Sequence, residues 1–458
     1  GMIPILREIV ELCITKKYIK LLFATESFAI GLDCPIKTAM FLSLRKFDGN
    51  NDRGLHSHEY TQMAGRAGRR GIDTVGYVIH CNNLFKPPSE STYREMLCGK
   101  PPRLVSKYKI SYTTVLNVVH RHKHRVPLSK IVDFTNNSMM YQEVQKEIQD
   151  QQKLVEQLRN GDAHKGMFCC NTPYEVCAEY HDLKEKSKHL GNKKKKDCLK
   201  RMSQLADKYK KIETDIEVWK THEKKRKETE NEEAYLGHLE KYIENKTQKI
   251  CSVLESQGFL DRCLDETYSL TQLGTFASQI AEVDSVPWAI CLVRRWDFLP
   301  NFTTEQIVGL LSCATDIKVP EQYRKHAPLI EDESLASKLR ELKSVYDEYA
   351  QYELDHNITS GIDYESPLMY DIVEDAMAWC ACDSEESCKL FITERLQDRE
   401  IAIGDFTKAM MKIATIAREL QTMSDMECCQ GQIEWLHKLT QIEDMVLKYI
   451  ATNQSLYV

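Results

Sequence analysis

The chain has 458 residues, of which 62 are lysine or arginine and 68 are aspartate or glutamate, so its formal net charge is −6 at pH 7. At about 100–200 residues per domain, this length predicts two to four domains with sizeable cores. A hydrophobic content of 42% and a charged content of 28% exclude a collagen-like, a mainly disordered and a membrane-embedded chain. No apolar run approaches the roughly 18 residues of a membrane-spanning helix.

Turn-forming residues are scarce, with 19 glycines and 13 prolines in the chain. Typical shares are about 7% and 5%, so we expect a mostly helical protein. The 17 cysteines are scattered, and the first residues carry acidic side chains without the small-residue cleavage site of a secretory signal. We therefore expect reduced cysteines and an intracellular location, cytoplasmic or nuclear.

Residues 1–98 alternate between helical and strand patterns. Residues 3–16 have apolar side chains near a 3.6-residue period, which predicts a helix. Short apolar runs at 18–24, 38–44 and 75–81 predict buried strands, and a polar helix is expected at 57–66. Strands and helices in this order indicate a parallel α/β sheet, in which ligands meet the loops after the strand ends.

Two segments of this region have unusual sequences. Residues 24–35 read ATESFAIGLDCP, and residues 62–71 read QMAGRAGRRG. Glycines allow a close approach of the backbone, and arginines offer planar forks for phosphate oxygens. A basic turn in solvent, or arginines bound to a nearby carboxylate, is the alternative for any arginine cluster. The glutamine, the glycines and the spacing together favour phosphate binding.

These two segments resemble known helicase motifs. Residues 62–71 closely resemble motif VI of superfamily-two helicases, and residues 24–35 resemble motif V. Together with LRKFDG at 44–49, they are similar to the superkiller-type DExH-box RNA helicases of the exosome pathway. LTQLGTFA at 270–277 resembles the end of that family's winged helix, and ATNQSLYV at 451–458 resembles its C-terminal signature.

The resemblance implies that motif VI meets ATP through Gln62, Arg66 and Arg69. Arg69 matches the position of an arginine finger. Such an arginine neutralises charge that develops on the transferred γ-phosphoryl group.

The resemblance also implies further contacts from the same motifs. Asp33 matches a position that reaches the ribose hydroxyls, where asparagine is commoner in the family, and Gly31 and Gly65 would approach the nucleotide. Thr25 and Glu26 would lie at the nucleic acid. Contacts to the RNA backbone rather than to bases suit an enzyme that moves along RNA.

A helicase also needs a G-x-x-x-x-G-K-[ST] loop and an acidic magnesium-binding motif. Residues 99–102 (GKPP) do not form such a loop, and DEYA at 347–350 lies in a polar helical run. We interpret the chain as the C-terminal half of a longer protein. Binding of the cofactors ATP and Mg²⁺ would then require a missing N-terminal part, which supplies the Mg²⁺ ligands. The chain alone would be inactive.

The expected organisation is α/β plus all-α, with a partial RecA-like parallel sheet followed by a winged helix, a helical stalk and a helical bundle. The expected domains are the second RecA-like domain at 1–98, the winged helix at 99–160 and 251–285, the stalk at 161–250, and the bundle at 286–458.

The stalk is expected from two apolar stripes, at 199–219 and 236–254, which predict packed antiparallel helices; an ordinary bundle core is the alternative. In the family this arm usually ends in a small β-barrel, which we do not expect here. Residues 193–227 hold 14 basic and 6 acidic side chains. We expect RNA phosphate contacts from Lys193, Lys194, Lys195 and Lys196, with a solvated face as the alternative.

In the bundle, residues 403–408 resemble the start of a central helix. Lys408 and Lys412 stand where the family has arginines, and Lys408 is a candidate RNA contact. We expect no metal site, because the clustered cysteines lack the paired C-x₂₋₄-C units of a zinc site.

The resemblance implies an ATP-dependent 3′→5′ RNA helicase that acts in RNA unwinding and turnover. Its partners would be RNA, single-stranded or with a 3′ overhang, and proteins of an RNA-decay complex; no membrane is implied. The alternative is a non-catalytic RNA-binding or adaptor protein that uses the stalk and the bundle.

Overall fold

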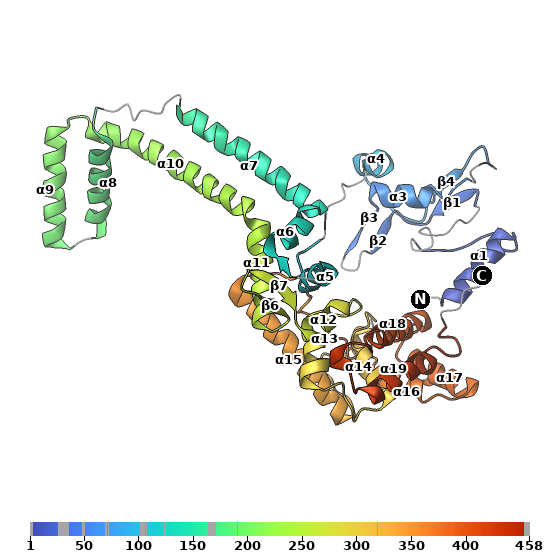
Figure 1. The fold of residues 1–458 in the computed structure, drawn as a ribbon. Helices are drawn as coiled ribbons and strands as arrows, with labels where there is room; N and C mark the ends of the chain where they lie inside the picture. The colour runs from blue at the N-terminus through green and yellow to red at the C-terminus, as the bar shows by residue number, and fades with distance from the viewer. Residues whose placement is uncertain are drawn as a thin grey trace. The chain divides into compact units, whose positions relative to one another are not determined.

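The computed structural model describes residues 3–25, 36–47, 51–68, 71, 73–100, 106, 108–122, 125–163, 171–189, 191–317 and 319–452. The chain divides into two compact units, one formed by residues 1–105 and 270–458 and the other by residues 106–269. Helices dominate, and one small parallel sheet lies in the N-terminal part (Figure 1). This confirms the expected combination of α/β and all-α structure.

The N-terminal part contains three described helices and four short strands. These are α1 (Pro4–Thr15), β1 (Thr38–Phe41), β2 (Arg45–Phe47), β3 (Asp52–Gly54), α3 (Ser57–Ala64), β4 (Tyr77–His80) and α4 (Glu90–Cys98). Strands β1 and β4 pair in parallel, from Thr38 opposite Tyr77 to Phe41 opposite His80, and α3 lies in the connection between them. Strands β2 and β3 form an antiparallel hairpin. The predicted strand–helix–strand order is therefore confirmed. The expectation that these strands are buried is wrong, because the β4 side chains of Tyr77, Val78 and Ile79 are exposed.

The strand expected at residues 18–24 is wrong. This segment has no ladder partner among the described residues. Leu21 is 67% exposed and Phe23 is 76% exposed, while Ile19 and Leu22 are half-buried. An apolar run becomes a strand only where a neighbouring backbone takes up its hydrogen bonds. The sequence pattern alone could not supply that neighbour.

In the unit of residues 106–269, the first and last segments pack together into a small cluster of helices and strands. Helices α5, α6 and α11 pack against one another next to the sheet of order β5-β7-β6. The elements are α5 (Tyr112–His122), β5 (Val126–Pro127), α6 (Leu128–Asn136), α11 (Tyr242–Ser256), β6 (Leu260–Arg262) and β7 (Thr267–Leu270). The assignment of a winged helix to this region remains a prediction.

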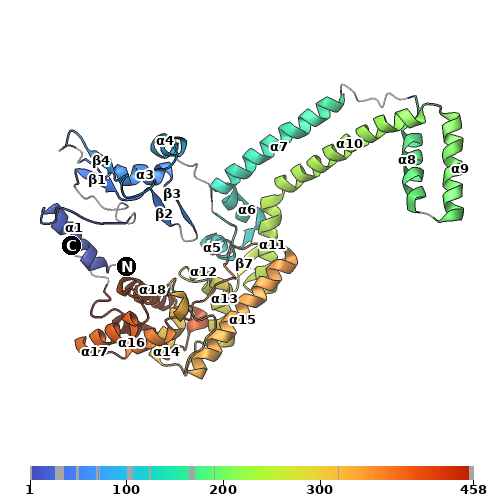
Figure 2. The ribbon, with the colours of Figure 1, turned by 180° about the vertical axis from the view of Figure 1, so that it is seen from behind.

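A long helical hairpin rises from that cluster. Helices α7 (Met139–Ala163) and α10 (Ile212–Glu240) run side by side in opposite directions (Figures 1 and 2). Side chains bridge them, because Tyr235 donates a hydrogen bond to Glu147 at 2.7 Å and Arg159 pairs with Glu233 at 2.7 Å. Exposed polar bridges of this kind add little stability each, and the buried side chains of Ile148 and Val155 on α7 add apolar packing.

At the far end of the hairpin, α8 (Tyr174–His189) and α9 (Asn192–Lys208) pack with the beginning of α10. Their shared core consists of Cys177, Tyr180, Leu205, Ile212, Ile216 and Trp219. The apolar stripe at 199–219 is thus divided between two helices, with a turn after Lys208. Both halves of the stripe face the same core, which is why one continuous periodicity covers two elements.

Residues 270–452 form the helical bundle. Its elements are α12 (Gln272–Gln279), α13 (Ser285–Ala289), η1 (Ile290–Arg295), α14 (Thr304–Ser312), η2 (Glu321–Tyr323), α15 (Glu333–His356), α16 (Val373–Cys380), α17 (Glu385–Phe391), η3 (Ile392–Gln397), α18 (Ile403–Gln421), η4 (Glu427–Cys429) and α19 (Ile433–Val446). Helix α18 packs on α14 and α19. Trp379, Phe391 and Phe406 contact one another with ring centroids 5.3–5.7 Å apart. This aromatic contact joins three helices in the core.

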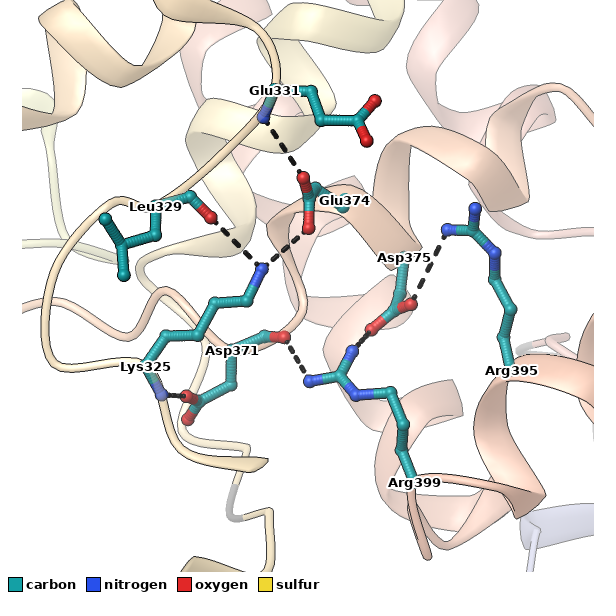
Figure 3. Close-up of polar contacts among 8 residues, drawn as sticks. All are labelled: Lys325, Leu329, Glu331, Asp371, Glu374, Asp375, Arg395 and Arg399. Carbon is teal, nitrogen blue, oxygen red and sulfur yellow. Dashed lines mark hydrogen bonds and ion pairs between the residues drawn. The ribbon is translucent and has the colours of Figure 1, made fainter. Parts of the chain in front are cut away.

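An ion-pair network fastens the loop before α15 to α16 (Figure 3). The Lys325 ammonium contacts the Glu374 carboxylate at 2.6 Å, and the Lys325 backbone N–H donates to Asp371 at 2.6 Å. Arg399 bonds the Asp375 carboxylate and donates to the Asp371 carbonyl at 2.8 Å. The Arg399 contact to Asp375 therefore also ties the segment after η3 to α16.

Asp375 is a deeply buried charge of this network, at 3% exposure. Burial raises the pKa of its carboxyl, and the guanidinium groups of Arg399 and Arg395 lower it by a smaller amount. The ionised carboxylate therefore depends on its arginine partners.

Among the described residues, every helix is too short or too polar to traverse a lipid bilayer.

We expect Asp375→Asn to destabilise α16 and the segment around Arg399. Loss of one partner of a fully buried ion pair costs about 3–5 kcal/mol, and the loss here should be nearer 2 kcal/mol because a fifth of the Arg399 side chain is exposed. Hydrogen exchange of the α16 amides measures it locally, as a chain with several domains does not unfold in two states. The exposed Lys343–Asp347 pair on α15 is the matched control. If Lys343→Ala and Asp375→Asn have equal effects, the network is not a structural fastening.

Candidate functional site

The predicted motif VI begins on α3. The His56 backbone N–H donates to the Glu59 carboxylate at 2.8 Å, which satisfies a free donor at the start of the helix. One face of α3, with Tyr60, Met63 and Ala64, packs on the core formed by Phe41, Leu44, Leu55 and Met96. The opposite face leaves Gln62 exposed. The helix is therefore held by its apolar side while a motif residue faces solvent.

Glu59 binds donors from three elements at once. Its carboxylate receives two hydrogen bonds from the Arg53 guanidinium, both at 2.8 Å, and one from the Lys46 ammonium at 2.9 Å. Glu59 is 6% exposed, and the Arg53 hydrogen bonds hold the pKa of its carboxyl far below the usual range. The β2–β3 hairpin is thereby attached to the beginning of α3.

The backbone after α3 fits between the starts of two strands. Ala67 pairs with Ile36 in an isolated parallel bridge, and the Gly68 N–H donates to the Ile36 carbonyl at 3.0 Å. Gly68 has a φ of +87°, which favours glycine, and a Cβ on Gly76 would lie 2.4 Å from the Ala67 carbonyl oxygen. Two glycines therefore permit the contact between the end of the predicted motif VI and the residue that follows the predicted motif V.

A cluster of polar and aromatic side chains packs against α3 on the side of β4 and α4. The Tyr60 hydroxyl lies 3.1 Å from Nε2 of His80, and the Tyr93 hydroxyl contacts Nδ1 of the same ring. Burial lowers the pKa of His80, so its neutral form is favoured, with one ring nitrogen donating and the other accepting. Phe41 stacks on Tyr60 with ring centroids 5.1 Å apart.

The residues of the two segments that are predicted to contact nucleotide or RNA fall into two groups. Gln62 and Gly65 are exposed, and Arg66 is half-buried at the end of the same helix. Gly31, Asp33, Arg69 and Glu26 lie outside the described residues, and Thr25, at the edge of the described part, is exposed. The structure thus brings three of the predicted residues to one end of α3. Their roles remain predictions.

The predicted RNA lysines differ in their surroundings. Lys194, Lys195 and Lys196 are exposed near the start of α9, and no ion pair of theirs is found within the described part of the chain. The side chain of Lys193 lies outside that part. Lys408 is exposed and pairs with Asp405 at 3.1 Å, while Lys412 pairs with Glu282. Lys408 is therefore already partly neutralised by its own helix.

Sequence reasoning missed Glu59, Arg53 and Gly76. The usual capping-box signature was not available for Glu59, because the residue three positions before it is His56 rather than Ser, Thr, Asp or Asn. No sequence signal pointed to Arg53, which reaches Glu59 from another element, or to Gly76.

Among the described residues, no three or more His, Cys, Asp and Glu side chains are grouped so as to hold a metal ion. The tetrad at 347–350 lies in α15, where Asp347 pairs with Lys343 and Glu348 pairs with Arg295 at 2.9 Å. Its charges are used in surface ion pairs of the bundle.

No family model matches the chain. Curated relatives do match it over part of its length. The chain is 38% identical over 179 residues to the antiviral helicase SKI2 of Saccharomyces cerevisiae, which is 39% of this chain and 14% of that protein. It is 45% identical over 127 residues to the human Superkiller complex protein 2, covering 28% of this chain and 10% of the relative. It is 44% identical over 120 residues to the ATP-dependent RNA helicase mtr4 of Schizosaccharomyces pombe, covering 26% and 10%. The chain thus spans only about a seventh or less of these proteins.

We expect Gly76→Ala to displace the loop after α3, because the added Cβ would meet the Ala67 carbonyl oxygen at 2.4 Å. The Gly68 amide should then exchange its hydrogen at least tenfold faster, which corresponds to about 1.4 kcal/mol. Gly54→Ala is the matched control, since a Cβ there would have no atom within 4 Å. Equal exchange in both variants would show that the Gly76 contact does not hold the loop.

Proposed function

We propose that this chain, a relative of the superkiller-type DExH-box RNA helicases, is part of an ATP-dependent RNA helicase that moves 3′→5′. The names of the relatives include ATP-dependent RNA helicases and a superkiller complex protein. We extend these activities to the full-length protein. Its substrate would be single-stranded RNA or RNA with a 3′ overhang, and its partners would be proteins of an RNA-decay complex inside the cell.

The observation that carries the proposal is the contact that the loop after α3 makes with Ile36. The hydrogen bond from Gly68 to Ile36 joins the loop after α3 to the residue that directly follows motif V. The end of segment 62–71 and the residue that follows segment 24–35 are therefore held together. Such a contact would let one set of residues respond to both a nucleotide and an RNA strand.

The residues near this contact suit phosphate groups. Arg66 is half-buried beside the exposed Gly65, and its guanidinium is a group that binds phosphate oxygens well. ATP, when bound, supplies the γ-phosphoryl group whose hydrolysis drives movement. Gln62 and Arg66 would orient that group, and Arg69 would stabilise the charge that develops on it. Gly31 and Asp33 would contact the nucleotide from motif V.

The packing below α3 would keep these groups in place. Glu59 fixes the start of the helix through Arg53 and Lys46, and Tyr60 fixes its middle through His80. An orientation error of about 1 Å costs a large factor in rate, so this support matters for catalysis. Mg²⁺ would take its ligands from residues outside this chain, and Thr25 and Glu26 would lie along the RNA backbone.

In the full-length protein, Arg69→Ala should lower kcat for RNA-stimulated ATP hydrolysis by about 10³-fold or more, because the transition state loses a positive charge. RNA affinity, measured by fluorescence anisotropy, should change less than about twofold, since the guanidinium would act on phosphates of the nucleotide. Arg94→Ala is the control: Arg94 is an exposed arginine of α4 that pairs with Glu90. An unchanged kcat in Arg69→Ala would refute the role of an arginine finger.

A second RNA contact is proposed at the far end of the hairpin. Lys194, Lys195 and Lys196 are exposed and lack ion pairs within the described part of the chain, whereas Lys186 and Lys188 on α8 pair with Asp182 and Glu185. Uncompensated lysines attract phosphate groups without reading sequence. The same feature favours the alternative function, a non-catalytic RNA-binding or adaptor protein, if the full-length protein does not hydrolyse ATP.

Replacing Lys194, Lys195 and Lys196 by glutamine should weaken binding to unrelated RNAs by a similar factor. The slope of log K against log salt should fall by about 0.7 for each RNA phosphate that the variant leaves without a lysine. Lys186→Gln with Lys188→Gln is the matched control, because these lysines are also exposed but already paired. If the α9 variant keeps both its affinity and its salt slope, α9 is a solvated face, and the tip is a better candidate for a protein-docking surface.

A further inference from the structure

Two adjacent cysteines lie in η4, in the connection between α18 and α19. The sulfur atoms of Cys428 and Cys429 are 3.9 Å apart. Cys428 is half-buried and Cys429 is 3% exposed. Reagents in solution can therefore reach Cys428 first, and the second thiol lies directly beside it.

The two thiols differ in acidity. The hydrogen bond from Cys429 lowers the pKa of Cys428 to about 7, and the same bond, together with burial, raises the pKa of Cys429. A substantial fraction of Cys428 is then thiolate at neutral pH, and the thiolate is the nucleophilic form.

Other cysteines of the bundle lack this combination. Burial raises the pKa of Cys291 and of Cys380 to about 12, so both thiols are unreactive at neutral pH. Burial also raises the pKa of Cys388, whose thiol has Cys382 as its neighbour. Cys382 and Cys388 are therefore the natural comparison pair.

Neither a stable disulfide nor a metal site fits the pair. Adjacent Cα atoms lie about 3.8 Å apart across a trans peptide bond, below the roughly 4.4–6.8 Å of ordinary disulfides. A structural metal ion requires about four ligands, and within the described ranges no third ligand joins these two. The ligand that fits two neighbouring thiols is a soft electrophilic atom that forms bonds to two sulfur atoms.

We propose that Cys428 and Cys429 together bind one trivalent arsenical of the type R–As=O. The two thiol hydrogens leave with the arsenic-bound oxygen as water, and two As–S bonds replace the As=O bond, so no oxidant or reductant is needed. Because the sulfurs are already neighbours, the second bond forms with little movement of the chain. The segment η4 packs on α12, so this chelate would form at a contact between two parts of the bundle.

Phenylarsine oxide tests the proposal on the whole chain. Cys169 and Cys170 are also adjacent but lie outside the described residues, so the parent for the test is Cys169→Ser with Cys170→Ser. After a wash with excess monothiol, which removes singly bound arsenic, intact-mass measurement should show one adduct per chain, with the mass of the arsenical minus one water. A dithiol should remove it.

Cys428→Ser in that parent should retain at least tenfold less adduct, while Cys382→Ser should retain as much as the parent. Cys428 is half-buried, so its serine variant is expected to fold, and circular dichroism checks this. Full retention by Cys428→Ser, loss in Cys382→Ser, or absence of a monothiol-resistant adduct in the parent would each overturn the proposal.

Discussion

The Glu59 carboxylate is the interaction on which the candidate site depends. It is almost fully buried, yet it is ionised, because Arg53 and Lys46 supply positive charge and His56 supplies a backbone donor. A buried charge with this many partners has essentially one satisfactory position. The beginning of α3 is therefore fixed relative to the β2–β3 hairpin, and the direction in which the helix delivers Gln62 and Arg66 follows from it.

The opposite end of α3 is held by a backbone contact that two glycines make possible. Gly68 adopts a left-handed conformation, and Gly76 leaves space for the Ala67 carbonyl, so two backbones touch where any Cβ would separate them. A charge cluster at one end and a backbone contact at the other hold a helix of only eight residues. Short helices are marginal by themselves, and tertiary contacts of this kind are what maintain them.

The bundle and the helical hairpin are stabilised by different kinds of contact. The bundle buries aromatic rings around Trp379 and balances its interior charges in pairs, as Asp375 does with Arg399. The hairpin of α7 and α10 combines polar bridges in solvent with buried apolar side chains on α7, and it has a further apolar core at the tip around Trp219. Exposed lysines at that tip cost little stability, so charge can accumulate there without disturbing the fold.

The sequence by itself determined the parallel strand–helix–strand unit and the mainly helical remainder, because periodicity is a local property; the motif assignments of residues 24–35 and 62–71 stay predictions. It did not determine that residues 18–24 would lack a strand partner among the described residues, that one apolar stripe would divide between α9 and α10, or that Arg53 would reach Glu59. Only the tertiary structure decided these, because each depends on which distant backbone or side chain becomes a neighbour. The same holds for the meeting of Gly68 with Ile36, where space for a backbone contact was created by a glycine at position 76.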